Sequence, residues 1–304
     1  MNIPRTSGFL NIYKTVGPTS YDCIRALKRV YLRENSTPPK MGHLGTLDPL
    51  AEGVLPVAIG PAGKLIRFFT AEKVYRATIR LGLATATDDS QGAVLAEADT
   101  SLVDETSIRA ALANFGGEIE QVPPRFSAVS TGGVKAYKRA RAGADFALKP
   151  KRVRISRIEL LDWTPPELEV RLTVGPGTYI RAFARDLGAK LGVGGCIAAL
   201  VRESDGPFLA ADALTVAEIE RTGVNGIAGA LYPPDFILRG FQRVDLTLEQ
   251  GKAFTMGKGI HGVEIPDDGL GYIGVYDDEG FIGMGTKSAN GCLKPIKIIR
   301  AEGY

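Results

Sequence analysis

One carboxylate stands out in this sequence because it lies in an apolar loop that is rich in glycine and proline. Asp48 is followed directly by Pro49, and the loop around it also contains Gly42, Gly45, Gly53, Leu44, Leu47, Leu50, Val54 and Leu55. Pro49 disfavours helical backbone at Asp48, so we expect the acid on a turn or extended loop. An unpaired buried carboxylate is costly, so Asp48 needs a partner. A rigid loop that presents one acid from an apolar wall suits an enzyme whose chemistry depends on one carboxylate.

The same pattern has a plainer interpretation, in which Asp48 caps a turn before Pro49 and the leucines are ordinary core. Nucleotide binding does not explain the glycines, since the segment lacks both G-x-x-x-x-G-K-[ST] and G-x-G-x-x-G. From residue types and spacing alone, the catalytic and the structural interpretation of Asp48 both stay open.

A second signal is the order of several longer motifs. Residues 40–56 read KMGHLGTLDPLAEGVLP, residues 73–75 KVY, residues 121–128 QVPPRFSA, residues 177–181 GTYIR, residues 200–202 LVR and residues 206–208 GPF. Together with GFLNIYK at residues 8–14, this series resembles the TruB-type tRNA pseudouridine-55 synthases, whose signature reads roughly G-H-x-G-T-L-D-P-x-A-x-G-x-L. The resemblance spans residues 8–208. It departs at Lys14–Thr15, where that family usually has Lys-Pro.

The resemblance implies a role for particular side chains. Asp48 matches the essential carboxylate, and Arg181 is the expected partner, because a guanidinium stays charged and can hold a carboxylate by two bonds. Tyr75 matches the tyrosine that stacks on the target base and assists removal of its C5 proton. Tyr179 and Leu200 match walls of the base pocket. His43 matches a flat side chain that fills the space left when the uridine is extracted from its stack.

The implied reaction isomerises uridine 55 in the T-loop of tRNA to pseudouridine, with no metal and no cofactor. Asp48 could add to the uracil ring, attack the sugar C1′ or remove the C2′ proton, and the sequence does not choose among these routes. Three other functions stay open: an RNA-binding or tRNA-chaperone protein, a hydrolase of nucleoside bonds, and a synthase that depends on a guide RNA. The short chain favours action without a guide.

Basic residues gather in one part of the chain although the formal net charge is only +3. Between residues 135 and 157 lie Lys135, Lys138, Arg139, Arg141, Lys149, Lys151, Arg152, Arg154 and Arg157, against the single acid Asp145. Such a stripe suits a phosphate backbone, because bound Lys and Arg release counterions from it. We assign Lys149, Lys151 and Arg152 to tRNA binding; the alternative is a solvated helix face followed by a basic strand.

Composition narrows the class of protein. The three cysteines, Cys23, Cys196 and Cys292, are widely spaced, which favours reduced thiols in a cytoplasmic protein. Only two histidines occur, His43 and His261, so a zinc site is not expected. No run of 18 apolar residues and no secretory signal are found, so we expect neither a membrane partner nor export. The expected oligomeric state is a monomer.

The elements that must position these residues follow from periodicity. A short strand is predicted over residues 9–13, and two further strands over residues 73–83 and 168–174, where apolar and polar residues alternate. Helices are predicted from Ser20 as N-cap, over residues 108–115 before Gly116, over residues 180–191, and from Thr215 to Gly223. The resemblance implies an α+β catalytic domain over residues 1–240, with a mixed, largely antiparallel sheet flanked by helices. Gly-rich strands after residue 240 predict a small PUA-like β-barrel over residues 241–304.

Overall fold

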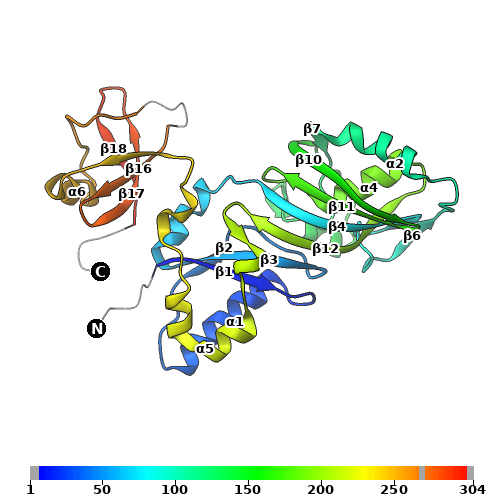
Figure 1. Ribbon diagram of the computed structural model, residues 1–304, viewed down its shortest axis with the longest axis horizontal. Coiled ribbons are helices and arrows are strands. Elements are labelled where there is room, and N and C mark those ends of the chain that lie inside the picture. Colours follow the sequence, from blue (N-terminus) through cyan, green and yellow to red (C-terminus); the bar gives the residue numbers. More distant parts are fainter. Residues whose placement is uncertain (1–6, 267–270, 300–304) are drawn as a thin grey trace.

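The computed structural model describes residues 7–266 and 271–299, which form one large mixed sheet, flanking helices and a smaller sheet near the C-terminus (Figure 1). The large sheet has ten strands, with a main path β14-β1-β3-β12-β4-β11-β10-β7. Strand β2 pairs with β3 and β13 with β12. Neighbours are antiparallel except for β1 with β14 and β3 with β12. The predicted mixed, largely antiparallel α+β architecture is therefore confirmed.

The strands of the large sheet are β1 Gly8–Lys14, β2 Met41–His43, β3 Ala51–Ile59, β4 Lys73–Leu81, β7 Gly117–Gln121, β10 Lys151–Thr164, β11 Glu167–Val174, β12 Gly195–Asp205, β13 Phe208–Leu209 and β14 Leu214–Thr215. Two separate hairpins are β5 Leu83–Thr85 with β6 Val94–Glu97, and β8 Ser130–Thr131 with β9 Val134–Lys135.

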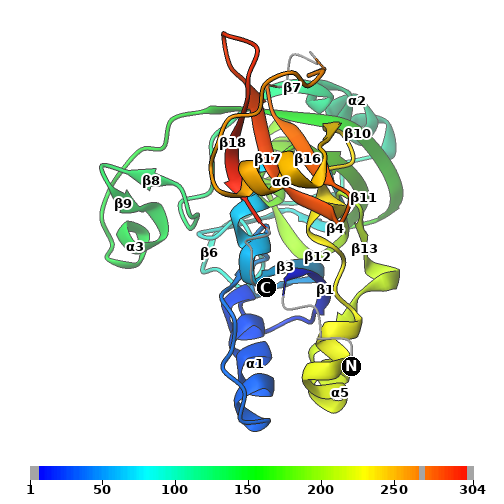
Figure 2. The same cartoon turned by 90° about the vertical axis from the view of Figure 1, so that its left-hand side faces the viewer.

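The helices are α1 Ser20–Arg33, α2 Glu105–Leu112, α3 Ala136–Arg141, α4 Ile180–Lys190, α5 Val216–Gly229 and α6 Leu248–Thr255. Helices α1 and α5 lie side by side at one end of the large sheet, and α4 packs on β12 (Figure 1). The short helix α3 stands out from the sheet together with β8 and β9 (Figure 2). A segment with four of the basic residues of the stripe, Lys135, Lys138, Arg139 and Arg141, therefore projects from the body of the protein.

The alternating pattern of the central strands is confirmed by burial. On β4, Tyr75, Ala77, Ile79 and Leu81 are buried, whereas Arg76 and Arg80 between them are exposed. On β11, Leu168, Val170, Leu172 and Val174 are buried in the same way. The buried rows belong to one large apolar core that also holds Phe183 of α4 and Leu27 of α1. Burial of this face fixes the register, because a slip by one residue would turn every apolar side chain to solvent.

Two helix boundaries differ from the prediction. The N-cap of α1 is Thr19, not Ser20, because Thr19 and Asp22 cap each other in a reciprocal box while the Ser20 hydroxyl is used elsewhere. The helix that begins after Thr215 does not end at Gly223. Its backbone breaks there, with φ at 69°, and a further helical stretch runs to Gly229.

The C-terminal part forms an open sheet rather than the predicted closed barrel. Its strands are β15 Gln242–Asp245, β16 Ile273–Asp277, β17 Gly280–Lys287 and β18 Leu293–Ile298, in the order β15-β16-β17-β18. Across the described residues, a single bridge between Ile260 and Leu293 extends this sheet, and no pairing joins β15 to β18. Helix α6 packs against β16 and β18. Four strands with one covering helix can bury their apolar residues without closing on themselves.

A mixed apolar cluster joins the two sheets. Phe68 at the end of the 3-10 helix Gly60–Phe68 contacts Tyr272 and Phe241 through edge-on rings, with centroids 5.1 and 6.4 Å apart. Met284 of β17 is fully buried in the same cluster as Phe9 of β1. The C-terminal sheet is therefore packed against the part of the chain that forms the large sheet.

Candidate active site

Asp48 lies on the loop between β2 and β3, with its backbone in neither helix nor strand, as the following proline predicts. Its side chain keeps 39% of its surface exposed. The residue before it, Leu47, is fixed by the buried hydroxyl of Ser20, which accepts a hydrogen bond from the Leu47 amide at 2.8 Å and donates to its carbonyl oxygen at 2.9 Å. The helix α1 therefore holds the loop immediately beside the acid.

We expect the Ser20→Ala substitution to destabilise the protein, because the buried amide and carbonyl of Leu47 would lose their partner. An unsatisfied buried polar group costs about 1–3 kcal/mol, and the free energy of unfolding should fall by that amount. Urea unfolding followed by fluorescence measures it. Ser156→Ala, at an exposed serine of β10, is the matched control. Equal unfolding free energies for the two variants would show that Ser20 does not secure the loop.

A buried lysine holds the other side of the same loop. The Lys14 ammonium at the end of β1 donates hydrogen bonds to the carbonyl oxygens of Thr15 at 2.9 Å and of Ala51. The carbonyl oxygen of Pro49 lies 3.5 Å from it. Burial lowers the pKa of Lys14, and the charge of Asp48 is among the groups that oppose this shift. Lys14 therefore fastens the backbone on the C-terminal side of the acid.

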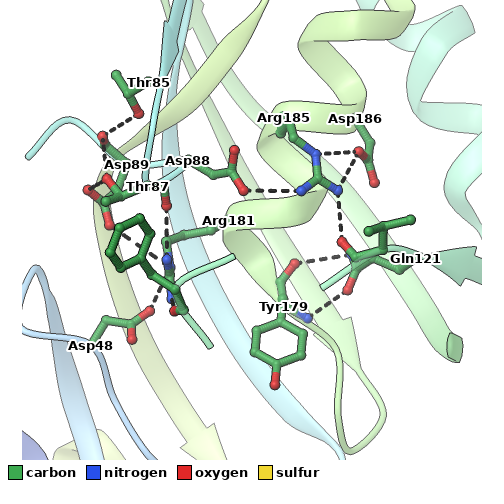
Figure 3. Close-up of polar contacts among 12 residues, drawn as sticks. Asp48, Thr85, Thr87, Asp88, Asp89, Gln121, Tyr179, Arg181, Arg185 and Asp186 are labelled. Atoms are coloured by element: carbon green, nitrogen blue, oxygen red, sulfur yellow. Dashed lines mark hydrogen bonds and ion pairs between the residues drawn. The ribbon is translucent and has the colours of Figure 1, made fainter. Parts of the chain in front are cut away.

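Arg181 is the partner of Asp48, as predicted, but the pair has one bond rather than two. The guanidinium Nε donates to the Asp48 carboxylate at 2.8 Å. Its other nitrogens donate to the carbonyl oxygens of Thr87 at 2.9 Å and Phe126 at 3.0 Å. The side chain is only 7% exposed, and it comes from the first turn of α4 (Figure 3). The arginine is thus held on three sides and leaves one carboxylate oxygen of Asp48 free of it.

The turn after β5 is a part of the site that the sequence motifs did not indicate. Asp89 accepts hydrogen bonds from the Thr87 hydroxyl at 2.6 Å and the Gln91 amide at 3.2 Å. The same carboxylate lies 4.0 Å from the Arg181 Nε, so two acids flank one guanidinium (Figure 3). Two adjacent acids, Asp88 and Asp89, follow an amphipathic strand in the sequence, and this pair is the signal that could have indicated the turn.

A second arginine, one helical turn further along α4, has a similar set of partners. Arg185 donates to Asp88 at 3.1 Å, to Asp186 at 2.9 Å and to the carbonyl oxygen of Val122 at 2.8 Å (Figure 3). Burial raises the pKa of Asp88, and the charge of Arg185 opposes that shift. Arg185 therefore ties the same turn to the same helix without touching Asp48.

Tyr75 and Leu200 lie on neighbouring strands and belong to the same core. Leu200 of β12 pairs with Ala77 of β4 on one side and with Ala51 of β3 on the other, three residues after Asp48. Both Tyr75 and Leu200 are 7% exposed. Burial raises the pKa of Tyr75, while the charge of Arg202 lowers it. Leu200 therefore lies next to Ala51, where the Asp48 loop runs into β3, and Tyr75 is close enough for the charge of Asp48 to raise its pKa.

Tyr179 occupies the last position before α4, two residues from Arg181. Its backbone amide donates to the Gln121 side chain at 2.9 Å, and its carbonyl oxygen accepts from the same amide group at 3.1 Å. Gln121 is buried, and the tyrosine ring points away from it (Figure 3). Burial raises the pKa of Tyr179. The two hydrogen bonds from the Gln121 side chain to the Tyr179 backbone therefore fix this residue at the N-terminus of α4.

His43 ends β2, five residues before Asp48, and its backbone pairs with Val57. Burial lowers the pKa of His43, and the charge of Arg202 lowers it further, so the ring is neutral near pH 7. Within the described residues its Nδ1 is buried without a hydrogen bond. A neutral, flat ring suits stacking better than acid–base work.

The part of the basic stripe that lies near the site is the beginning of strand β10. Lys149, Lys151 and Arg152 are all exposed. Lys151 pairs with Gln121, whose side chain holds Tyr179, so Lys151 emerges on the face that carries the site. Arg152 follows on the opposite face of β10, because neighbouring side chains alternate. The three residues therefore share a region but not one face.

No three His, Cys, Asp or Glu side chains gather at ligand distance within the part of the chain that the structure describes. No helix in that part is both long and apolar enough to cross a membrane.

Comparisons with known proteins identify the family that the chain resembles. The family model described as TruB family pseudouridylate synthase (N terminal domain) matches residues 29–180. The chain is 40% identical over 296 residues to tRNA pseudouridine synthase B of Gloeobacter violaceus, covering 96% of this chain and 98% of the relative. It is 40% identical over 304 residues to the enzyme of the same name in Synechococcus elongatus, covering 97% and 99%.

Solved structures show the same fold at lower identity. A chain in the crystal structure of a Cbf5-Nop10-Gar1 complex superposes with a TM-score of 0.73 at 23% identity, covering 97% of this chain and 86% of that one. A chain in the structure of an H/ACA RNP bound to a substrate RNA gives 0.72 at 21% identity, covering 97% and 86%. By its family model and its full-length relatives, the chain belongs to the TruB family of pseudouridylate synthases.

Proposed function

We propose that this chain converts uridine 55 in the T-loop of tRNA to pseudouridine, acting as a monomer in the cytoplasm. The observation that carries the proposal is the Asp48 carboxylate, which lies on a rigid loop and is partly exposed. It accepts a hydrogen bond at 2.8 Å from the buried Arg181, whose other two nitrogens bond to backbone carbonyls. The full-length relatives named tRNA pseudouridine synthase B have the same reaction in their name. The geometry and the relatives support each other, since the reaction needs a fixed carboxylate that the substrate can reach and Asp48 is partly exposed.

The reaction breaks the bond between N1 of uracil and the sugar C1′ and forms a bond between C5 and C1′. Asp48 is the group that initiates it, by addition to the base, by attack at C1′ or by removal of the C2′ proton. Its oxygen that does not face Arg181 is the one available for this step, while the guanidinium bonds to the other oxygen and so orients the carboxylate. The C5 proton leaves and N1 takes up a proton, so the base rejoins the same sugar and the product is an isomer of the substrate.

The remaining site residues have supporting roles in this proposal. Tyr75 offers its ring for stacking on the base and its hydroxyl near the C5 proton. Tyr179 and Leu200 line the base pocket. His43 fills the gap in the T-loop stack after the uridine is extracted, which its neutral ring allows.

An unmodified tRNA transcript incubated with the purified full chain tests the function. Chemical mapping of pseudouridine is expected to find one modified site, in the T-loop. Release of free uracil would instead identify a nucleoside-bond hydrolase. Tight binding with an unchanged transcript would identify an RNA-binding or chaperone protein, and either result would overturn the proposal.

The proposed division of the chain is a catalytic domain over residues 1–240 and an RNA-binding, PUA-like domain over residues 241–304. The connector Pro234–Ile237 and the separate four-stranded sheet support a boundary near residue 240. The shared apolar cluster with Phe68 and Met284 means that the second domain has a fixed place on the first. A fixed domain of this kind can extend the tRNA-binding surface without contributing to the chemistry.

Neutralising the basic residues near the site is expected to weaken tRNA binding without slowing the chemical step. For each phosphate that the protein no longer binds, the slope of log affinity against log salt falls by about one unit. Lys149→Gln, Lys151→Gln and Arg152→Gln together should therefore lower it by up to about three. The single variants separate the two faces of β10. Filter binding at several salt concentrations measures the slope, and single-turnover assays at saturating enzyme measure the chemistry.

Arg33→Gln, at the far end of α1, serves as the control for a change of surface charge alone. An unchanged slope in the triple variant would show that the stripe does not contact phosphate. A single-turnover rate that saturating enzyme cannot restore would place the stripe in the reaction centre instead.

A further inference from the structure

Three buried charged side chains lie directly beneath the loop that carries Asp48. Arg202 and Asp205 of β12 are fully buried, and the Lys73 side chain of β4 is 15% exposed. The Lys73 ammonium bonds to one oxygen of Asp205, and the Arg202 Nη1 lies 3.5 Å from the other. We call these three residues the Arg202 cluster. None of them is explained by the chemistry assigned above.

Arg202 joins the two ends of the Asp48 loop. Its Nη2 donates to the carbonyl oxygen of Gly45 at 3.0 Å, and its Nε donates to that of Val54 at 2.7 Å. These carbonyls lie three residues before and six residues after Asp48. One rigid, planar guanidinium therefore sets the width of the loop at its base, which a flexible ammonium cannot do.

The fit around the loop is close. A Cβ placed on Gly45 would lie 3.3 Å from the Arg202 Nη1 and 3.4 Å from the Lys73 Nζ. A Cβ on Gly53 would overlap the Arg202 backbone, at 2.2 Å from its carbonyl oxygen. Because Gly45 and Gly53 have no side chain, the loop can pack directly against the Arg202 cluster. A shift of Arg202 would therefore move the loop backbone as well.

The same cluster connects the loop to Tyr75. Across β12 and β4, Arg202 pairs with Tyr75 and Asp205 pairs with Lys73. Arg202 therefore contacts both the strand that carries Tyr75 and the loop that carries Asp48. A buried guanidinium is costly to desolvate, and the Asp205 carboxylate, which also bonds to Lys73, compensates for that cost only in a defined arrangement.

We propose that Arg202, held by the Asp205 carboxylate that Lys73 fixes in turn, is the positioning residue that sets the Asp48 loop against Tyr75. The inference rests on the proposed function, because it concerns the geometry of that reaction centre. Arg202 does not touch the reacting atoms and acts through the loop backbone. A misplacement of the reacting group by about 1 Å costs about 100-fold in rate, so a small change at Arg202 should have a large kinetic effect.

The test uses the full chain with Arg202→Lys, Asp205→Asn and the double variant. Single-turnover rates on unmodified tRNA are measured over a range of enzyme concentrations, together with the melting temperature. We expect Arg202→Lys to lower the maximal rate about 100-fold and Asp205→Asn about tenfold. The half-saturating enzyme concentration should change less than about threefold, since the phosphate-binding residues are intact. If Asp205 acts through Arg202, the double variant should be no slower than Arg202→Lys alone.

Arg171→Lys is the matched control, because Arg171 of β11 bonds to Glu203, the next residue of β12, on the opposite face. An equal loss of rate in the control, a rate for Arg202→Lys near wild type, or a loss confined to the half-saturating concentration would each overturn the inference. If Arg202→Lys does not fold, Asp205→Asn decides, and an unchanged rate in that variant overturns it. A wild-type chain that makes no pseudouridine overturns the proposed function instead, which keeps the two failures distinct.

Discussion

The Asp48→Asn variant is expected to bind tRNA with wild-type affinity and to form no pseudouridine. Asparagine has the same shape, and its amide oxygen can still accept the hydrogen bond from the Arg181 Nε that the carboxylate accepts at 2.8 Å. It lacks the negative charge and the reactive oxygen that all three possible routes require. Loss of the central group of a catalytic unit costs at least about 10⁴-fold in rate, so product should be absent on the time scale of the assay.

Single-turnover formation of pseudouridine and filter binding of the transcript measure the two halves of this prediction. Glu52→Gln, an acid four residues later at the start of β3, is the matched control for loss of one negative charge near the loop. It should react as the wild type does. Turnover in Asp48→Asn near the wild-type rate, with host enzyme excluded, would show that another group starts the reaction.

The strands and helices that carry the site were predictable because their side chains repeat with the period of the element. The buried rows of β4 and β11 alternate along the sequence, and the apolar residues of α4 recur at helical spacing. The Asp48 loop was predictable because Pro49 restricts the backbone and the glycines have no side chain to obstruct it. Side-chain periodicity and backbone restriction depend only on neighbouring residues, so they can be predicted from the sequence alone.

The contacts that hold Arg181 were not predictable, because they join segments far apart in the chain. Thr87 and Phe126 contribute backbone carbonyls, which are the same for every residue type and leave no trace in composition. The expected two-bond pair with Asp48 was wrong for this reason, since two of the three donor positions were already engaged. Ser20 was assigned to the helix cap for a similar reason, because its bond to Leu47 crosses 27 positions.

The arrangement of the C-terminal sheet was also not predictable, because it too depends on contacts between segments far apart in the chain. Short strands separated by glycines predict β-structure, but they do not say whether the first strand pairs with the last. In the described residues, α6 and the cluster around Phe68 cover the sheet, so its apolar residues are buried without closure. Packing against another part of the chain, rather than local pattern, decided between a barrel and an open sheet.

Arg181→Lys is expected to lower the rate of pseudouridine formation about 100-fold or more while the protein stays folded. Lysine keeps the positive charge, but its single nitrogen cannot bond at once to Asp48 and to the carbonyls of Thr87 and Phe126. Either the carboxylate loses its fixed partner or two buried carbonyls do. Displacement of the reacting carboxylate by about 1 Å accounts for the loss of rate. Unpaired carbonyls cost about 1–3 kcal/mol each in stability.

Arg185→Lys separates these two effects, because Arg185 has the same kinds of partners on the same helix. It bonds to the carboxylates of Asp88 and Asp186 and to the carbonyl of Val122, and it does not contact Asp48. Urea unfolding should therefore show a loss of stability in both variants, whereas single-turnover assays should show the large loss of rate only in Arg181→Lys. Equal rates in the two variants would mean that Arg181 serves to anchor α4 against the Asp88-Asp89 turn, and that Asp48 reacts without a cation held beside it.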